Sequence, residues 1–233
     1  MISCLCPTYN RASGSLLGGL RLIHEAIASF IVQDYKDAEL IIVNDTPGQS
    51  LVYDNPRVKI YNMGERFPTL GQKIAYAISQ AQGDLLCRWD DDDIHLPWAL
   101  SYMRQRIDGE LEWRASNYWF HDERELPRVV DGAGNTHVQS LWWRNVLDRI
   151  GGYPVDVSGC EDQEFNNRLR RAGIGRCQEI ATDELYYIYR WGTGSQHLSG
   201  KADYTSTNPH QVHYDEIGRR PITVCLLYTS RCV

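Results

Sequence analysis

Residues 84–93 read DLLCRWDDDD, an apolar run that leads directly into four consecutive aspartates. The apolar part has the length and composition of a buried strand. In open sheets built from alternating strands and helices, ligands bind beyond the carboxyl ends of the strands. The four aspartates, Asp90–Asp93, which we call the acidic quartet, therefore stand where a ligand site is expected.

Strand-like and helix-like patterns alternate through the N-terminal part of the chain. Short apolar runs stopped by turn residues predict strands, whereas apolar residues three or four positions apart predict amphipathic helices. The order β, α, β, β, α, β is typical of an α/β domain in which helices flank a central, mostly parallel sheet. The expected strands are 2–6, 39–43, 57–61 and 84–89, and the expected helices are 16–30 and 70–81.

Polar residues follow three of these expected strands. They are Thr8–Arg11, then Asn44 and Asp45, and finally the acidic quartet. Because parallel strands end at the same edge of a sheet, these groups are expected to meet although they are distant in sequence. This convergence favours a single ligand site more strongly than any one motif does.

The second half of the chain has a less regular pattern. Ser158 and Glu161 have the spacing of a capping box, which predicts a helix running to Gly173. The other expected elements are a helix at 95–107, short strands within 113–144, a strand at 186–190 and a loop at 191–200.

Composition limits the possible partners and the organisation of the protein. The 233 residues carry a formal net charge of −6 without a basic block, so nucleic acid is not an expected partner. Seven cysteines without a CxxC pair predict free thiols in a reducing compartment. Without a signal-peptide pattern or a membrane span, we expect a cytoplasmic location. The length fits a single domain, residues 1–220, followed by a tail, 221–233, that need not belong to its core.

The acidic quartet has the chemistry of a divalent metal site. Adjacent carboxylates repel one another, and a bound Mg²⁺ or Mn²⁺ removes that conflict because hard cations prefer oxygen ligands. Alternate residues of an extended segment face the same way, so Asp90 and Asp92 can converge on one ligand. The alternatives are a solvated acidic turn, or capping of the next helix by Asp92 or Asp93.

Two further places carry candidate site residues. Glu161 and Asp162 fall in the first turn of a predicted helix, where an ionised carboxylate is stabilised and can accept a proton. Glu161 has the competing interpretation of a capping-box residue. His197, in the loop after the last expected strand, could complete a metal site or be an exposed loop histidine. Four aromatics, namely Tyr118, Trp119, Trp142 and Trp143, could stack on sugar rings or belong to the core.

At four places in order, the sequence resembles the family 2 glycosyltransferases with the GT-A fold (the fold of nucleotide-diphospho-sugar transferases). The opening run ISCLCPTYNR at residues 2–11 is similar to their first strand, and IIVND at 41–45 to their second. The acidic quartet resembles their DxD metal motif, and GCED at 159–162 their ED motif. The usual acidic-Gly-Ser turn reads NDTP at 44–47, and the usual Arg-Asn pair of the second helix reads Gln72-Lys73.

The resemblance implies a metal-dependent inverting glycosyltransferase that moves a sugar from a nucleotide donor, expected to be UDP-linked, to a hydroxyl of a carbohydrate or glycoconjugate. Asp162 and Glu161 would be the catalytic residues, with Asp162 as the general base. Asp92 and His197 would hold Mn²⁺ or Mg²⁺. Nucleotide contacts are expected from Pro7, Thr8, Tyr9, Arg11, Asp45, Lys73, Asp90 and Asp91.

Other classes of protein fit the residues less well. A sugar-nucleotide pyrophosphorylase needs a glycine-rich basic loop after the first strand, and residues 7–11 contain no glycine. A phosphatase with an aspartate nucleophile needs a Thr or Val at a spacing that is missing after the quartet. A non-catalytic module that binds a nucleotide-sugar or a metal remains open.

Overall fold

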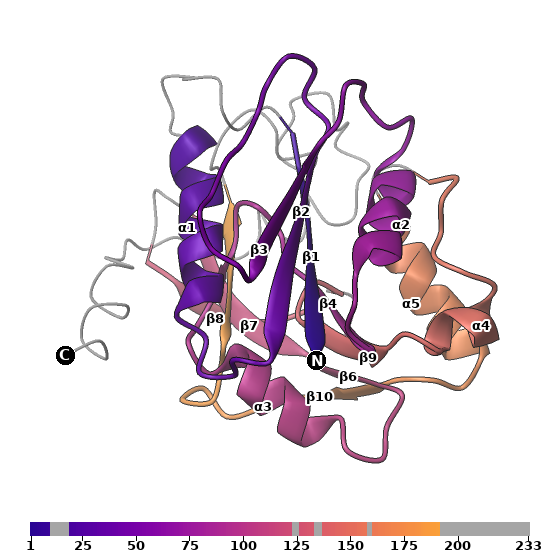
Figure 1. Ribbon diagram of the computed structural model, residues 1–233. Helices are drawn as coiled ribbons and strands as arrows, with labels where there is room; N and C mark the ends of the chain where they lie inside the picture. Colours follow the sequence, from indigo (N-terminus) through magenta and orange to yellow (C-terminus); the bar gives the residue numbers. More distant parts are fainter. Residues whose placement is uncertain (10–18, 123–125, 133–136, 158–159, 192–233) are drawn as a thin grey trace, which may run out of the picture.

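The computed structural model describes residues 1–9, 19–122, 126–132, 137–157 and 160–191 (Figure 1). Within these ranges, helices cover both faces of a seven-stranded sheet, and a second, four-stranded sheet lies beside it. The expected α/β class is therefore confirmed. The single-domain boundary at residue 220 stays a prediction, since residues 221–233 lie outside the described residues.

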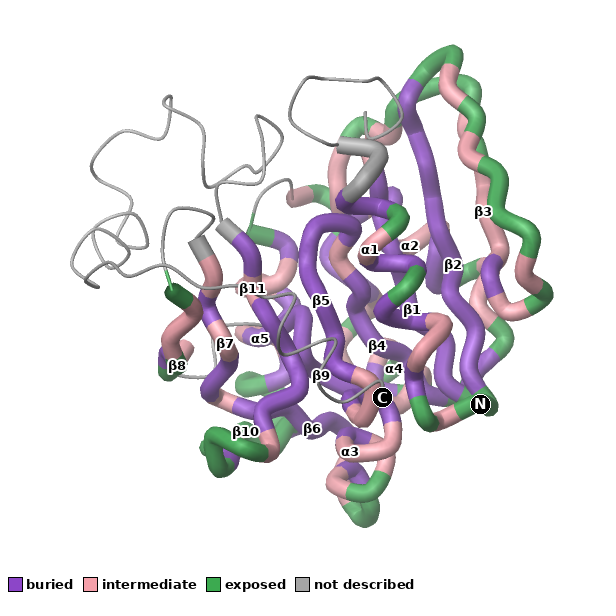
Figure 2. Tube along the Cα trace, turned by 90° about the vertical axis from the view of Figure 1, so that its left-hand side faces the viewer, coloured by how far each residue is buried: buried purple, intermediate pink, exposed green. Residues whose placement is uncertain are grey.

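The large sheet has the strand order β10-β6-β9-β4-β1-β2-β3. It is mostly parallel: β1 pairs in parallel with both β2 and β4, and only β9 runs against its neighbours. Figure 2 shows β1 and β2 buried along their length, whereas β3 forms the more exposed edge. The strands are β1 (Ile2–Thr8), β2 (Ala38–Asn44), β3 (Val58–Asn62), β4 (Leu85–Arg88), β6 (Glu112–Ala115), β9 (Ser140–Trp143) and β10 (Arg176–Gln178).

Side chains of the central strands alternate between two cores, as the two-residue period of a strand requires. Cys4 and Cys6 pack with helices α1 and α3, whereas Leu5 faces the opposite side, with α2, α4 and α5. Figure 1 shows these two groups of helices on opposite faces of the sheet. The helices are α1 (Gly19–Ile31), α2 (Leu70–Gln80), α3 (Ala99–Arg106), α4 (Val146–Ile150) and α5 (Glu161–Arg171).

The second sheet has the order β5-β11-β7-β8 and joins distant parts of the chain. Its strands are β5 (Ile94–His95), β7 (Asn117–Asp122), β8 (Arg128–Asp131) and β11 (Tyr187–Trp191). The prediction of a helix from residue 95 is wrong at its start, because His95 pairs with Tyr187 of β11 and stacks on Trp89, with ring centroids 3.9 Å apart. Helix α3 begins only at Ala99.

Several expectations about the whole chain can be compared with this fold. The five described cysteines are free thiols, as expected from the absence of a disulfide pattern. In the described ranges, no helix is long and apolar enough to cross a membrane.

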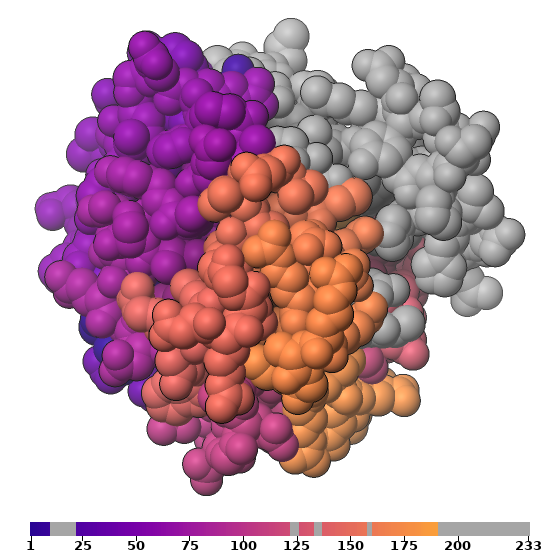
Figure 3. Space-filling model, turned by 90° about the vertical axis from the view of Figure 1, so that its right-hand side faces the viewer, coloured from indigo at the N-terminus to yellow at the C-terminus, as the bar shows by residue number. Residues whose placement is uncertain are grey.

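Helix α2 touches the segment that precedes α5 through Gly71. A Cβ atom at this position would overlap the carbonyl oxygen of Pro154, and the Thr69 hydroxyl donates to the carbonyl of Val155 next to it. Figure 3 shows this face of the molecule, on which the later segments lie directly against the N-terminal ones. The glycine is therefore needed for close approach of two backbones.

Gly71→Ala is expected to destabilise the protein by about 2 kcal/mol, because the added methyl group forces the 154–155 backbone away. Alanine is the better helix former, so a loss of stability identifies the clash. Urea unfolding measures the change. Gly64→Ala is the matched control, since nothing lies within 4 Å of a Cβ there. Equal stability of the two variants would contradict the packing argument.

Candidate active site

The carboxyl ends of β1, β2 and β4 bring the three predicted polar groups together. Thr8 is paired with Asn44 in the parallel register, and the Thr8 hydroxyl donates to Asp91 Oδ2 at 2.6 Å. Thr8 and Asp91 are both buried. The predicted convergence of strand ends is thus confirmed for the described residues, and Asp91 ties the quartet to β1.

Asp45 and Lys73 form a buried ion pair at this edge of the sheet. Lys73 Nζ lies 2.5 Å from Asp45 Oδ1 and donates to the carbonyl oxygen of Thr8 at 3.1 Å. The backbone N–H of Phe67 donates to the other Asp45 oxygen at 3.0 Å. Burial lowers the pKa of Lys73, although the Asp45 carboxylate opposes that change. The pair joins β2, α2 and the end of β1.

Tyr9 continues this group toward solvent. The Arg66 guanidinium lies 4.1 Å from the centroid of the Tyr9 ring, and Lys73 Nζ lies 5.9 Å from it. An aromatic face that is only partly buried and flanked by cations suits a planar, electron-rich ligand such as a nucleobase. Arg11, the other residue predicted here, lies outside the described residues.

The members of the acidic quartet have different partners. Asp90 Oδ1 accepts a hydrogen bond from Arg88 Nε at 2.5 Å. Asp93 is almost fully buried and accepts from the Tyr187 hydroxyl and, at 2.8 Å, from the backbone N–H of Arg190. Burial and the neighbouring carboxylates raise the pKa of Asp93. The suggested capping of the next helix by Asp93 is therefore wrong, because its carboxylate binds β11 of the second sheet.

Asp92 lies in the chain next to Asp93, and its main chain is held by a contact of its own. Its backbone carbonyl accepts from Arg190 Nε, and the Arg190 guanidinium also pairs with Glu25 of α1. One arginine on β11 thereby joins the main chain of the quartet to helix α1. Sequence reasoning missed Tyr187 and Arg190, because nothing in a single strand-like run shows which distant segment it pairs with.

Glu161 and Asp162 occupy the first turn of α5, as predicted, but Glu161 is its first residue and not the third, as the predicted capping box requires. Helix α5 begins at Glu161, and the N-cap residue is Cys160, whose side chain makes no capping hydrogen bond. Ser158 lies outside the described residues. Glu161 Oε2 instead accepts from the backbone N–H of Cys160 at 3.3 Å. The Glu161 carboxylate thus binds the backbone of the N-cap residue beside it.

Asp162 is partly buried, and the backbone N–H of Gln163 donates to its Oδ1 at 2.8 Å. Burial, reinforced by the Glu161 carboxylate, raises the pKa of Asp162 to about 6, against the opposing effect of Arg88. A carboxyl group with this pKa is ionised at neutral pH, yet it is a stronger base than an ordinary aspartate. Asp162 thus has the acid–base properties of a catalytic base.

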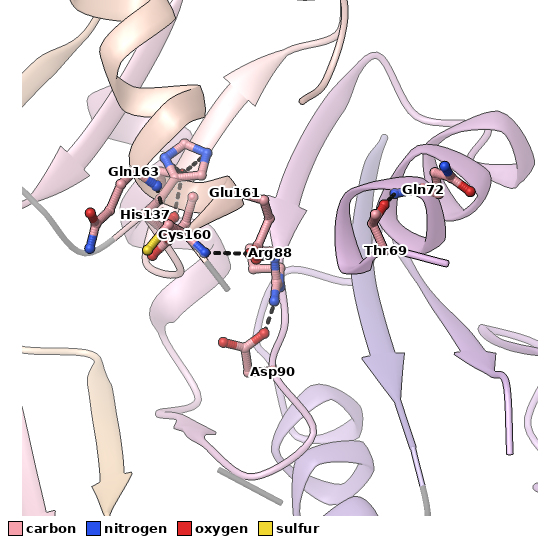
Figure 4. A network of polar contacts seen from close by, with 10 residues as sticks. Thr69, Gln72, Arg88, Asp90, His137, Cys160, Glu161 and Gln163 are labelled. Atoms are coloured by element: carbon pink, nitrogen blue, oxygen red, sulfur yellow. Dashed lines mark hydrogen bonds and ion pairs between the residues drawn. The ribbon is translucent and has the colours of Figure 1, made fainter. Parts of the chain in front are cut away.

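Arg88 connects the acidic quartet to α5. Its Nε binds Asp90, and its Nη1 lies 3.3 Å from Glu161 Oε1. Figure 4 shows the Arg88 side chain between these two carboxylates. The sequence carried a signal for this residue, because an arginine inside an otherwise apolar buried strand needs a charged partner.

The quartet fits a divalent cation by the chemistry of its donors. Asp90 and Asp92 supply hard carboxylate oxygens, and the Asp90 side chain keeps 21% of its surface exposed. Among the described residues, no cluster of three or more His, Cys, Asp or Glu side chains could hold a metal by itself. Mg²⁺ is commonly bound by one or two carboxylates and completed by phosphate oxygens. His197 lies outside the described residues.

Two of the four aromatics suggested as sugar platforms belong to the core. Trp142 packs against Phe165 of α5 with ring centroids 5.0 Å apart, and Tyr118 is buried against Tyr187. Trp119 and Trp143 are partly buried against the hydrophobic clusters. Trp142 and Tyr118 therefore pack inside the protein and do not form an exposed platform for a sugar ring.

Comparison with known proteins gives a family match and a similar fold. Residues 3–112 match the family model for Glycosyl transferase family 2. Over 201 residues the chain is 29% identical to the GalNAc(5)-diNAcBac-PP-undecaprenol beta-1,3-glucosyltransferase of Campylobacter jejuni, which corresponds to 81% of this chain and 62% of that protein.

Solved structures share the GT-A architecture. TarS 1–349 of S. aureus, solved in complex with UDP-GlcNAc, has a TM-score of 0.63 at 17% identity, covering 83% of this chain and 59% of that one. The mannosyltransferase PcManGT of Pyrobaculum calidifontis, in complex with GDP-Man and Mn²⁺, has a TM-score of 0.56 at 15% identity, covering 85% and 58%. The chain thus spans less than two thirds of each of these relatives.

Proposed function

We propose that this chain, which belongs to glycosyl transferase family 2 through residues 3–112 and has the GT-A fold, is a metal-dependent inverting glycosyltransferase. It would move a sugar from a nucleotide-diphosphate donor to a hydroxyl of a carbohydrate or glycoconjugate. The observation that supports this most directly is the Arg88 bridge, which joins the carboxylates of the acidic quartet to the first turn of α5. A donor site and an acceptor base need to be neighbours for direct transfer.

The proposed chemistry is one in-line displacement. Asp162 takes the proton of the acceptor hydroxyl while that oxygen forms its bond to the anomeric carbon, and the bond from this carbon to the diphosphate oxygen breaks on the opposite face. Inversion at the anomeric carbon follows from a single displacement. The pKa of about 6 keeps Asp162 ionised and ready to accept the proton at neutral pH.

The donor side is assigned to the ends of β1 and β2. Thr8, Tyr9 and Asp45 would contact the nucleoside, with Lys73 holding Asp45 in place at 2.5 Å. Asp90 would lie near the ribose and Asp92 would ligate Mn²⁺ or Mg²⁺. A bound cation at the quartet would stabilise negative charge on the leaving diphosphate. One relative was solved with UDP-GlcNAc, which favours a UDP-linked donor here.

The acceptor class follows from the curated relative. The name of the Campylobacter jejuni enzyme places its acceptor sugar on undecaprenyl diphosphate. We therefore propose a glycoconjugate acceptor, with a lipid-linked saccharide as the first one to try.

The proposal is tested with wild-type protein and a panel of UDP- and GDP-sugars, with and without Mn²⁺. A thermal-shift screen identifies donors, because only ligands that bind the native state raise the unfolding midpoint. A luminescent assay then measures release of the nucleoside diphosphate. Slow, Mn²⁺-dependent release from one donor supports a transferase. Binding without any release supports the non-catalytic module instead.

Asp92→Ala is expected to weaken Mn²⁺-dependent binding of UDP by at least roughly 10-fold, since a direct carboxylate ligand is lost. Isothermal calorimetry with UDP, alone and with Mn²⁺, measures the change. Asp108→Ala is a suitable control, because Asp108 is an exposed aspartate outside the site. If Mn²⁺ enhances UDP binding to Asp92→Ala as strongly as to wild type, the ligand assignment is wrong.

A further inference from the structure

Arg88 lies on the α5 face of β4 because side chains alternate along a strand. Leu85, Cys87 and Trp89 belong to the core under α1, whereas Leu86 belongs to the core under α2 and α5. Arg88 shares the orientation of Leu86, and its side chain is only 10% exposed. The chain thus places a permanent positive charge inside the sheet face on which the first turn of α5 sits.

The guanidinium of Arg88 uses different nitrogen atoms for two motifs: Asp90, two positions away on the chain, and Glu161, 73 positions away. Nε contacts Asp90 at 2.5 Å, and Nη1 contacts Glu161 at 3.3 Å. Glu161 in turn holds the backbone at the start of α5, because its second carboxylate oxygen accepts a hydrogen bond from the N–H of Cys160. The bridge therefore fixes the start of α5, on which Asp162 is the second residue.

Resting on the function proposed above, we infer that Arg88 is a positioning residue for sugar transfer. By holding Asp90 and Glu161 together, it sets the place of Asp162 relative to the donor. In this arrangement Glu161 also has a positioning role, as the anchor of α5. Lysine is a poor substitute, because a single ammonium group does not reproduce the planar fork that reaches two carboxylates.

A second buried pair shows what a purely structural bridge looks like in the same sheet. Arg114 Nη1 lies 2.7 Å from Glu112, two residues away on the same strand β6. Both residues lie on β6, and the pair includes no residue of the acidic quartet or of α5. Arg114→Met therefore serves as the matched control for losing a buried arginine, whereas Arg88→Met loses a buried arginine together with the bridge.

The experiment compares Arg88→Met, Arg88→Lys, Glu161→Gln and the double variant Arg88→Met/Glu161→Gln with wild type and Arg114→Met. We measure kcat, the donor KM, the pH profile of turnover and the binding of UDP with Mn²⁺. Arg88→Met is expected to lower kcat by roughly 100-fold while the donor KM changes much less, as for a misplaced catalytic group. Arg88→Lys should recover part of this loss.

Two readouts separate positioning from general damage. Loss of Arg88 removes a cation that lowers the pKa of Asp162, so the acid limb of the pH profile should move to higher pH. Because Arg88 acts through Glu161, the double variant should be little worse than the poorer single variant. Arg114→Met should share any loss of thermal stability but neither of these effects.

Other outcomes would contradict either the positioning role of Arg88 or the proposed function. If wild type is active and the kcat values of Arg88→Met, Arg88→Lys and Glu161→Gln stay within about 2-fold of it, the positioning role is wrong and the proposed function stands. If Arg88→Met is too unstable to assay, Arg88→Lys and Glu161→Gln decide the question. If wild type releases no nucleoside diphosphate from any donor, both proposals fall together.

Discussion

Asp162→Asn is expected to lower sugar transfer by roughly 10²–10⁴-fold, the usual contribution of a positioned general base. The amide keeps the size of the side chain and can still accept from the N–H of Gln163, so the start of α5 should survive. Only the ability to take up a proton is lost. Binding of UDP with Mn²⁺ should therefore remain close to the wild-type value.

The pH dependence of the wild-type enzyme belongs to the same prediction. A base acts only when it is ionised, and burial raises the pKa of Asp162 to about 6. Turnover should thus be nearly full at pH 7 and above, and it should fall about tenfold per pH unit well below pH 6. The residual activity of Asp162→Asn should lack this acid limb.

The matched control is Asp148→Asn, which changes an exposed aspartate in the first turn of α4. It alters the net charge and a helix start in the same way, and its turnover should equal that of wild type. Near-normal turnover of Asp162→Asn, or an unchanged acid limb in that variant, would refute the assignment of the base.

Asp93→Ala is expected to destabilise the fold by about 3 kcal/mol, because it leaves two buried donors without their acceptor. These donors are the Tyr187 hydroxyl and the backbone N–H of Arg190, and both belong to β11. Urea unfolding should show a lower midpoint with a similar slope. Asp93→Asn should lose less, since the amide carbonyl still accepts one of the hydrogen bonds.

Asp108→Ala is again the control, because an exposed surface aspartate changes stability by less than about 0.5 kcal/mol. If Asp93→Ala unfolds at the same urea concentration as wild type, the Asp93 carboxylate does not hold the second sheet to the quartet. The hydrogen bond from the Tyr187 hydroxyl to Asp93 would then contribute nothing to the free energy of unfolding.

The large sheet was predictable because its signals are local. Strands β1, β2 and β4 are short apolar runs with polar stops, and their parallel order follows from the helices between them. The same local logic placed Thr8, Asp45 and the acidic quartet at one edge. The contact of Thr8 with Asp91 agrees with that expectation, because β1 and β4 are neighbours in the sheet.

The second sheet was not predictable in the same way. Strand β5 has only two residues, and it is a strand because β11 supplies its partner more than ninety positions later. Residues 95–107 were predicted as one helix, because nothing in the local sequence shows that His95 stacks on Trp89. Tertiary pairing overrides local propensity there, and no window of sequence contains both partners.

The start of helix α5 was predicted incorrectly for a different reason. Ser158 and Glu161 have the right residue types at the right spacing, yet the helix starts at Glu161. Glu161 is the first residue of the helix and not the third, and its carboxylate pairs with Arg88 of β4 as well as with the N–H of Cys160. The local residue pattern could not show this ion pair, which links the acidic quartet to the first turn of α5.

The bond between Asp93 and Arg190 spans 97 positions. A ribosome adds about 5–20 residues per second, so roughly ten seconds separate the synthesis of the acidic quartet from that of Arg190. During this interval the nascent chain can already pair β1, β2 and β4, while the quartet has no β11 to bind. A nascent chain stalled before residue 187 should therefore contain a formed N-terminal sheet and an incomplete site. Limited proteolysis of such a stalled complex should cut the chain near residues 90–95. A longer stalled chain, from which β11 has left the exit tunnel, should resist cleavage there.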